Sequence, residues 1–284
     1  MFGSVMDMAR SGTAFVLGGG GVLGAVEVGM LRALFEAGIA PDLVVGTSVG
    51  ALNGAIVATE PGPGAAERLE RLWLEVASGS AKVYDGNPVK QVRRALATGT
   101  HLHSAKPLRE RLEQELGDVT FDELAVPFQC VAASIEKAGE HWFSKGRVVD
   151  AVLASSAVPG LLPPAEVEGE HFLDGGIVNS IPVGRAAELG AKTIFVLQVG
   201  RIERPLKPPT RPWEVARVSF EIARRHRFHR DIAALPRTVR AHVLPTGGGS
   251  ARDDAIRAYR DVSNVPRRIQ QAYDASRTYL QENL

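Results

Sequence analysis

The chain has 284 residues, of which 45% are hydrophobic, and its formal net charge is +1. This is the composition of an ordinary globular protein, and it argues against a disordered chain and against a nucleic-acid partner. The single cysteine, Cys130, excludes an internal disulfide framework, and its apolar neighbours predict a buried strand. A single cysteine also fits a reducing compartment, so we expect a cytoplasmic location. No Cys/His pairs have zinc spacing, and we expect neither a metal nor a cofactor.

The first apolar stretch, residues 13–34, could be mistaken for a signal peptide or a membrane span. Four consecutive glycines, Gly18 to Gly21, argue against a continuous helix there. No basic region followed by a small-residue cleavage site precedes the stretch either. We therefore predict a strand over residues 14–17, a glycine turn, and a helix to about residue 37 that Gly38 ends.

The next motif is Gly46-Thr47-Ser48-Val49-Gly50, between an apolar run at 43–45 and a small apolar stretch at 49–58. A strand, a sharp Gly-x-Ser-x-Gly turn and a helix form the nucleophile elbow of serine hydrolases. Such a turn lifts the Ser48 hydroxyl out of the strand end and places it near the positive end of the following helix. Chance matches to this short pattern are common, but the flanking elements favour a nucleophile over a plain tight turn.

The remaining chain alternates between helical and strand patterns as far as residue 199. Helices are predicted over about 65–76, 107–116 and 148–156, and strands over 127–134, 141–144 and 193–199. Repeated strand and helix units with apolar strands predict a mostly parallel sheet covered on both faces. The expected fold class is therefore α/β.

The glycine-rich segment Gly18-Gly19-Gly20-Gly21-Val22-Leu23-Gly24 lies at a predicted strand-to-helix junction. Backbone N–H groups at a helix N-terminus bind anions, and in an esterase that anion is the tetrahedral oxyanion. An alternative is a nucleotide-binding Rossmann-type protein, because the same glycines match G-x-G-x-x-G. Asp42 has about the right spacing for the acidic partner of that motif, but it precedes its strand instead of following it.

A third motif, Asp174-Gly175-Gly176, follows a strand-like segment. An isolated Asp-Gly usually caps a turn. Together, however, the motifs resemble those of the patatin-like phospholipase family, in the same order and over most of residues 13–200. The matching positions are Gly19-Gly20-Gly21-x-x-Gly24, Gly46-Thr47-Ser48-Val49-Gly50, the segment 154–164 and Asp174-Gly175-Gly176.

The resemblance implies a three-layer α/β/α sandwich and a lipid acyl hydrolase that needs no metal. It makes Ser48 the nucleophile, Asp174 its base, and the amides of Gly19, Gly20 and Gly21 the oxyanion hole. One departure is Leu23, which stands where the family loop commonly has an arginine. The backbone amides are unaffected by that change, but a cationic contribution from the loop is lost.

Two other classes compete with this interpretation. An α/β-hydrolase with a Ser-Asp-His triad would take its base from His226, His229 or His242, but Ser48 comes after only two strands, which is early for that fold. His171 is close to Asp174 in sequence without any reason to face Ser48. A non-catalytic lipid-binding module is the third class, and the intact serine and aspartate argue against it.

The C-terminal part, residues 201–284, is expected to be a helical extension packed on the 13–200 catalytic core, with residues 1–12 as an N-terminal tail. Residues 201–240 hold eleven Lys and Arg against four Asp and Glu. Peripheral membrane contact through Arg224, Arg225, Arg227 and Arg230 is one interpretation. The favoured one is a helix packed on the domain with its arginines in solvent.

Overall fold

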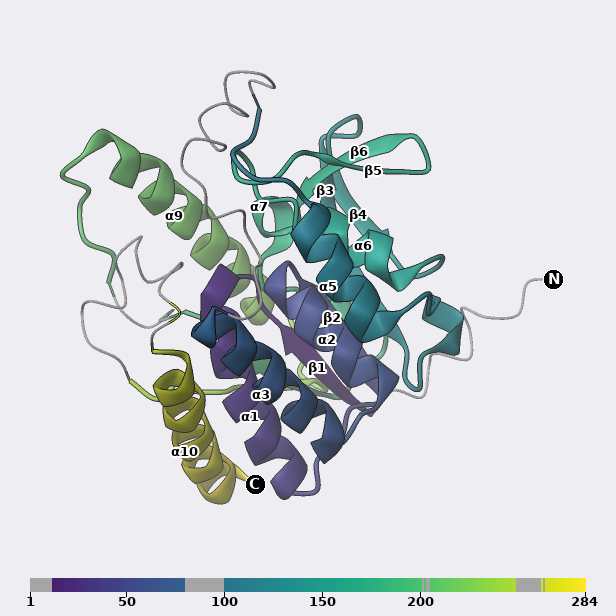
Figure 1. Cartoon of the computed structure of the whole chain (residues 1–284). Coiled ribbons are helices and arrows are strands. Elements are labelled where there is room, and N and C mark those ends of the chain that lie inside the picture. The colour runs from purple at the N-terminus through teal and green to yellow at the C-terminus, as the bar shows by residue number, and fades with distance from the viewer. Residues whose placement is uncertain (1–11, 80–99, 201, 203–204, 249–261, 263) are drawn as a thin grey trace.

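The structure is a computed structural model that describes residues 12–79, 100–200, 202, 205–248, 262 and 264–284. A sheet of eight strands runs through the molecule, and helices cover both of its faces (Figure 1). The predicted α/β/α arrangement around a mostly parallel sheet is confirmed. No helix in the described ranges is both long enough and apolar enough to span a membrane.

The sheet has a parallel half and an antiparallel half. Its strands are β1 (Thr13–Leu17), β2 (Leu43–Thr47), β3 (Phe128–Ser134), β4 (Gly139–Phe143), β5 (Ala165–Val167), β6 (Glu170–Asp174), β7 (Thr193–Leu197) and β8 (Arg240–Val243). Their order is β5-β6-β3-β2-β1-β7-β8, with β4 also paired to β3. The pairs among β3, β2, β1, β7 and β8 are parallel, so the loops that follow β1, β2 and β7 leave from the same edge. In open α/β sheets this edge carries the functional site.

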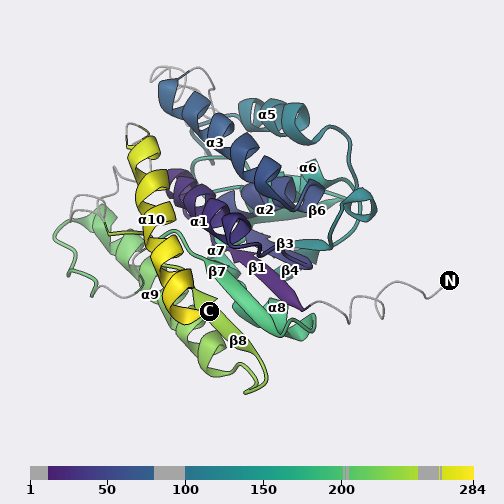
Figure 2. The same cartoon turned by 90° about the horizontal axis from the view of Figure 1, so that it is seen from below.

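Two apolar cores lie on the two faces of the sheet, because side chains alternate along each strand. In β1, Phe15 and Leu17 point to one core, and Ala14 and Val16 point to the other. The first core is covered by α1 (Ala25–Glu36), α2 (Val49–Thr59), α3 (Pro63–Ser78), α5 (Lys106–Leu116), α6 (Val148–Ser155) and α10 (Val265–Asn283). The second is covered by α8 (Val183–Glu188) and α9 (Pro212–Ala233), as Figure 2 shows from below.

Most predicted elements up to residue 199 are present within a few residues of their expected bounds. Cys130 is fully buried in β3, as predicted. The glycine turn contains a short 3-10 helix, η2 (Gly21–Gly24), before α1 begins, and a second, η3 (Phe121–Glu123), precedes β3. Gly38 follows α1 with φ +73°, the left-handed conformation that glycine adopts at helix ends.

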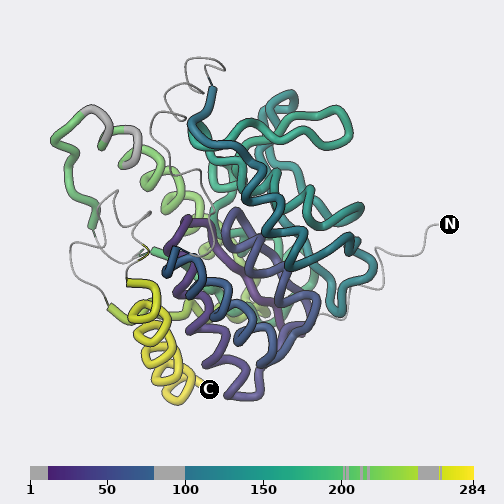
Figure 3. The backbone as a smooth tube through the Cα atoms, viewed as in Figure 1, coloured from purple at the N-terminus to yellow at the C-terminus, as the bar shows by residue number. Residues whose placement is uncertain are grey.

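The C-terminal part is not wholly helical, which corrects the sequence-based expectation. It contributes β8 to the edge of the sheet next to β7 and then α10, which packs along α1. The yellow C-terminal helix lies beside the purple N-terminal one in Figure 3. Gly29 of α1 permits this approach, because a methyl group there would collide with the carbonyl oxygen of Ile269. We infer that residues 13–200 and the C-terminal part form one domain.

Candidate active site

Ser48 occupies the turn between β2 and α2 in a strained conformation. Its φ is 55° and its ψ is −122°, a region that non-glycine residues rarely adopt. The Ser48 N–H donates to Ser155 Oγ at 2.8 Å, and that hydroxyl donates to the Val131 carbonyl at 2.6 Å. Ser155 therefore ties the elbow to β3 and offsets part of the strain that presents the Ser48 hydroxyl.

The motif glycines are required by close approach of backbone segments. A methyl group on Gly46 would lie 2.5 Å from the Gly50 carbonyl oxygen, and one on Gly50 would collide with the carbonyl of Leu17. A methyl group on Gly175 would likewise collide with the carbonyl of Val131. These glycines allow the elbow and the Asp174 turn to press against the sheet edge.

Asp174 ends β6 and lies directly against Ser48. The Ser48 hydroxyl donates to Asp174 Oδ2 at 2.6 Å, and the Gly176 N–H donates to Oδ1 at 2.7 Å. Both side chains are buried, with Ser48 6% and Asp174 8% exposed. Burial raises the pKa of Asp174 to about 6, although the two hydrogen bonds act in the opposite direction. The carboxylate is thus ionised at neutral pH and can accept the proton of the hydroxyl that it holds.

The glycine loop lies beside the elbow, but not all of its amides point to it. The Gly19 N–H, which was expected to serve an oxyanion hole, donates here to the carbonyl of Ser180 at 2.9 Å and so points into the fold. Within the described part of the chain, the N–H groups of Gly20 and Gly21 form no hydrogen bond. Gly20 must be glycine because a methyl group would overlap with the side chain of Val199.

Leu23, where the family loop commonly has an arginine, is a core residue in this chain. It is 9% exposed and belongs to the apolar core below the loop. A methyl group on Gly24 would collide with Val49 of the elbow helix, so the loop is held by apolar contact and close packing. The position suits leucine because a buried cation without a partner is costly.

The nucleotide alternative is wrong, because its acidic partner lies at the other end of the sheet. Asp42 Oδ2 accepts the N–H groups of Gly12 at 3.1 Å and Thr13 at 2.8 Å. These contacts tie down the start of β1, whereas the glycine loop follows the end of the same strand. Asp42 therefore cannot reach a ligand bound at the loop.

The triad alternative finds no support in the geometry, because Ser48 contacts Asp174 directly and none of the four histidines considered forms a hydrogen bond with either residue. His171 pairs with Glu136 at 2.7 Å on the surface. His226 and His229 are exposed on α9, and His242 stacks on Phe195 in the neighbouring strand, with ring centroids 5.1 Å apart.

Arg224, Arg225, Arg227 and Arg230 of α9 all take part in ion pairs, although the Arg230 side chain is 60% exposed. Arg224 has a side chain only 3% exposed and lies 3.4 Å from Glu221, so it cannot touch a membrane surface. Arg225 also pairs with Glu221, at 3.3 Å. Two further pairs are Arg227 with Glu140 at 2.7 Å and Arg230 with Asp231 at 3.4 Å. The helix is packed on the domain as favoured, but three of these arginines pair with acidic residues of α9 itself, and Arg227 pairs with Glu140 of β4.

A buried polar network below the glycine loop was not predicted from sequence. Asn53 Nδ2 donates to Glu27 Oε2 at 2.7 Å and to the Gly24 carbonyl at 3.1 Å, and Trp73 Nε1 donates to Asn53 Oδ1 at 3.2 Å. Glu27 is fully buried, and desolvation raises its pKa well above the ordinary value. Its isolated charge within an apolar stretch was the only available signal. The network fixes the loop to α2 and α3.

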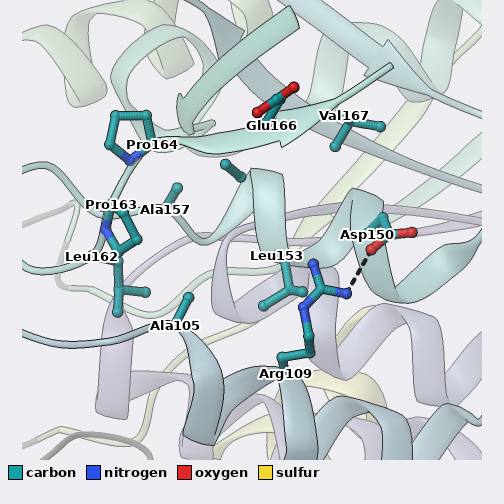
Figure 4. A pocket seen from close by; sticks show the side chains of 11 residues that line it. Ala105, Arg109, Asp150, Leu153, Ala157, Leu162, Pro163, Pro164, Glu166 and Val167 are labelled. Atoms are coloured by element: carbon teal, nitrogen blue, oxygen red, sulfur yellow. Dashed lines mark hydrogen bonds and ion pairs between the residues drawn. The ribbon is translucent and has the colours of Figure 1, made fainter. Parts of the chain in front are cut away.

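A separate cavity of about 280 Å³ lies between α5, α6 and β5 (Figure 4). Its walls are mostly apolar, and one end carries the ion pair between Arg109 and Asp150, 2.8 Å apart. The lining includes Ala157, whose carbonyl accepts the N–H of Asp174 at 2.9 Å. It does not include the side chains of Ser48 or Asp174, so the cavity adjoins the base of the site without containing it.

Comparison with known proteins identifies the family. A sequence model described as patatin-like phospholipase matches residues 15–187, which is more than half of the chain. The chain belongs to the patatin-like phospholipase family. The family predicted from the motifs is therefore confirmed.

Individual relatives are much longer than this chain. It is 33% identical over 191 residues to a lysophospholipase nte1 of Aspergillus terreus, an alignment that covers 66% of the chain and 12% of that protein. It is 31% identical over 189 residues to the human patatin-like phospholipase domain-containing protein 6, covering 66% and 13%. The chain thus spans about an eighth of the length of these curated relatives.

A solved structure supports the fold. VipD from Legionella pneumophila superposes with a TM-score of 0.50 at 15% sequence identity, covering 96% of this chain and 67% of that one. At this identity the similarity concerns the fold alone.

Proposed function

We propose that this chain hydrolyses carboxylic esters of lipids, in the manner of a phospholipase A or lysophospholipase, through a Ser48–Asp174 dyad. The observation that carries the proposal is the 2.6 Å hydrogen bond from Ser48 Oγ to the buried carboxylate of Asp174, in a chain of this family. The relatives named lysophospholipase support the choice of a lipid ester as substrate.

The proposed reaction needs only a nucleophile and a base. Ser48 Oγ attacks the ester carbonyl carbon while its proton passes to Asp174 Oδ2, and the carbonyl π electrons move to the oxygen. The tetrahedral intermediate collapses by breaking the bond to the leaving alcohol, which takes the proton from Asp174. Water then repeats the sequence on the acyl-enzyme, and the fatty acid leaves with Ser48 and Asp174 restored.

The amides of Gly20 and Gly21 are the backbone donors that we assign to the oxyanion. They lie at the entrance to η2 and α1, where the partial positive charge of a helix N-terminus favours an anion. Removing one donor from an oxyanion hole typically costs about 10²–10³ in kcat.

We propose further that the protein meets lipid aggregates through apolar side chains beside the dyad, instead of through the arginines of α9. Ile177 on α7 (Gly176–Asn179) is 44% exposed, and Phe220 on α9 is 43% exposed. A methyl group on Gly176 would lie 2.9 Å from Asp174 Oδ1 and 3.4 Å from the ring of Phe220, so the ring borders the site. We refer to Ile177 and Phe220 as the apolar rim.

The test is covalent labelling with a fluorophosphonate probe, followed by peptide mapping, and an assay on a lysophospholipid. We expect modification at Ser48, and loss of both labelling and turnover in Ser48→Ala. The Ser276→Ala variant, which changes another buried serine, serves as the control and should match the wild type. Labelling at another residue, or full turnover by Ser48→Ala, would refute the proposed function.

A further inference from the structure

Ser180, which follows α7, lies where the glycine loop meets the Asp174 turn. A methyl group placed on Gly19 would be 3.4 Å from both Ser180 Oγ and Ser48 Cβ. A methyl group on Gly176 would be 3.9 Å from Ser180 Oγ and 2.9 Å from Asp174 Oδ1. The Ser180 hydroxyl therefore borders the same small space as the nucleophile and its base, a space kept open by two glycines.

The hydroxyl of Ser180 has no use in the fold that the structure reveals. The residue is 4% exposed, yet its Oγ forms no hydrogen bond with any part of the chain that the structure describes. The carbonyl of the same residue is engaged, because it accepts the N–H of Gly19 at 2.9 Å. The Ser180 carbonyl thus engages the Gly19 amide of the loop, while the Ser180 hydroxyl lies beside Gly19.

We propose that the Ser180 hydroxyl is a catalytic donor to the oxyanion, together with the Gly20 and Gly21 amides. This inference rests on the proposed ester hydrolysis. When Ser48 Oγ bonds to the carbonyl carbon, the carbonyl oxygen gains the electron pair, and the Ser180 O–H donates a hydrogen bond to it without transferring its proton. The donation strengthens as negative charge develops, which is the property that accelerates a reaction.

Other roles for Ser180 agree less well with its surroundings. A serine nucleophile needs a proton acceptor beside it, and Asp174 Oδ2 already accepts from Ser48 and Oδ1 from the Gly176 N–H. A purely structural serine would bond to a backbone group, as Ser155 does with Val131. The position of the Ser180 hydroxyl beside Gly19, where an added methyl group would also meet Ser48 Cβ, instead suits a donor to the substrate oxygen.

The experiment compares wild type, Ser180→Ala and Ser276→Ala on a soluble short-chain ester and with a trifluoromethyl ketone of the same acyl chain. That ketone adds to Ser48 and carries an oxyanion, whereas the matching fatty acid does not. We expect Ser180→Ala to lower kcat by about 10²–10³ with little change in KM. Its affinity for the ketone should fall by the same factor, while inhibition by the fatty acid stays constant. The Ser276→Ala control, in α10, should change neither quantity.

Three results would overturn the proposal. One is a kcat for folded Ser180→Ala within about threefold of wild type. The second is a lower kcat with unchanged affinity for the ketone, which would make Ser180 a positioning residue. The third is a Ser180→Thr variant that folds and keeps its hydroxyl but remains as slow as the alanine variant. If the proposed ester hydrolysis itself is wrong, the fluorophosphonate probe will not label the wild type at Ser48, so that outcome is distinguishable from these three.

Discussion

At the scale of single residues, the burial of Asp174 sets the pH at which the site can work. Its pKa is about 6, above the ordinary 3.8, chiefly because burial disfavours the charged carboxylate. Only the ionised form can accept the Ser48 proton. We therefore expect kcat/KM to rise with pH, reach half its maximum near pH 6, and fall about tenfold per unit below that. Asp174→Asn, which has no ionisable group there, should be inactive across the whole range.

The same pKa predicts how stability varies with pH. The unfolded chain loses the Asp174 proton near pH 4, while the folded protein holds it until about pH 6. The contribution of this group to the free energy of unfolding therefore falls as pH rises through this window, by about 3 kcal/mol at most. Chemical denaturation at pH 4 and pH 7.5 should show this fall in the wild type but not in Asp174→Asn. An equal pH dependence in both proteins would contradict it.

Because this pKa is close to that of an ordinary histidine, the pH profile alone cannot separate a dyad from a triad.

Ser48 and Asp174 were predictable because each belongs to a short motif whose glycines are needed where backbone segments approach closely. Ser155 and Ser180 were not, since they act through hydrogen bonds to residues far away in sequence, Ser48 and Gly19. The local sequence around a single serine at a helix end does not reveal such a distant partner.

At the scale of elements, helix α9 shows why charge in a sequence is a poor guide to a surface. Its arginines look like a membrane-binding stripe, but acidic residues of the sheet and of α9 itself pair with them. Glu140, which pairs with Arg227, comes from β4, so its position could not be read from the local sequence.

Apolar periodicity located the strands and helices because it is a property of the local sequence. The same approach missed β8, a four-residue edge strand that is only half-buried.

The apolar rim formed by Ile177 and Phe220 leads to a prediction about lipid surfaces. Replacing both by serine should lower hydrolysis of lipid in vesicles by about tenfold or more, because partial burial of two large apolar side chains contributes roughly 1.5–3 kcal/mol. The matched control is Leu74→Ser, which changes a residue of α3 that is 40% exposed. Turnover of a soluble short-chain ester should fall much less in the rim variant than turnover of vesicle lipid.

Salt provides a second readout of how the protein contacts vesicles. Apolar contact should persist between 0.1 and 1 M salt, whereas contact through arginines would weaken as the Debye length shortens from about 10 to about 3 Å. Vesicle sedimentation at the two salt concentrations measures this. Equal loss of lipid hydrolysis in the rim variant and in Leu74→Ser, or strong salt dependence, would count against the rim.

At the scale of the whole molecule, α1 and α10, which are far apart in sequence, pack together on one face of the sheet. The α1 helix leads away from the glycine loop, and α10 covers it, with Tyr273 Oη donating to Glu36 at 2.6 Å. Family resemblance stops before this region, since the family model matches only residues 15–187. The docking of α10 depends on side-chain packing between distant segments, for which the sequence offers no local signal.

That packing predicts that the catalytic core and the C-terminal part unfold together. Gly29→Ala would force α1 and α10 apart, because the added methyl group meets the carbonyl of Ile269. Overpacking of this kind costs about 1–3 kcal/mol, or roughly 2–12 °C in Tm. Gly62→Ala is the matched control, since nothing lies within 4 Å of a methyl group there. Calorimetry should show one transition, and its Tm should be lower in Gly29→Ala but not in Gly62→Ala. Ester hydrolysis should be lost over the same temperature range as this transition. Two separate transitions, with hydrolysis surviving the first, would mean that residues 201–284 form a unit of their own.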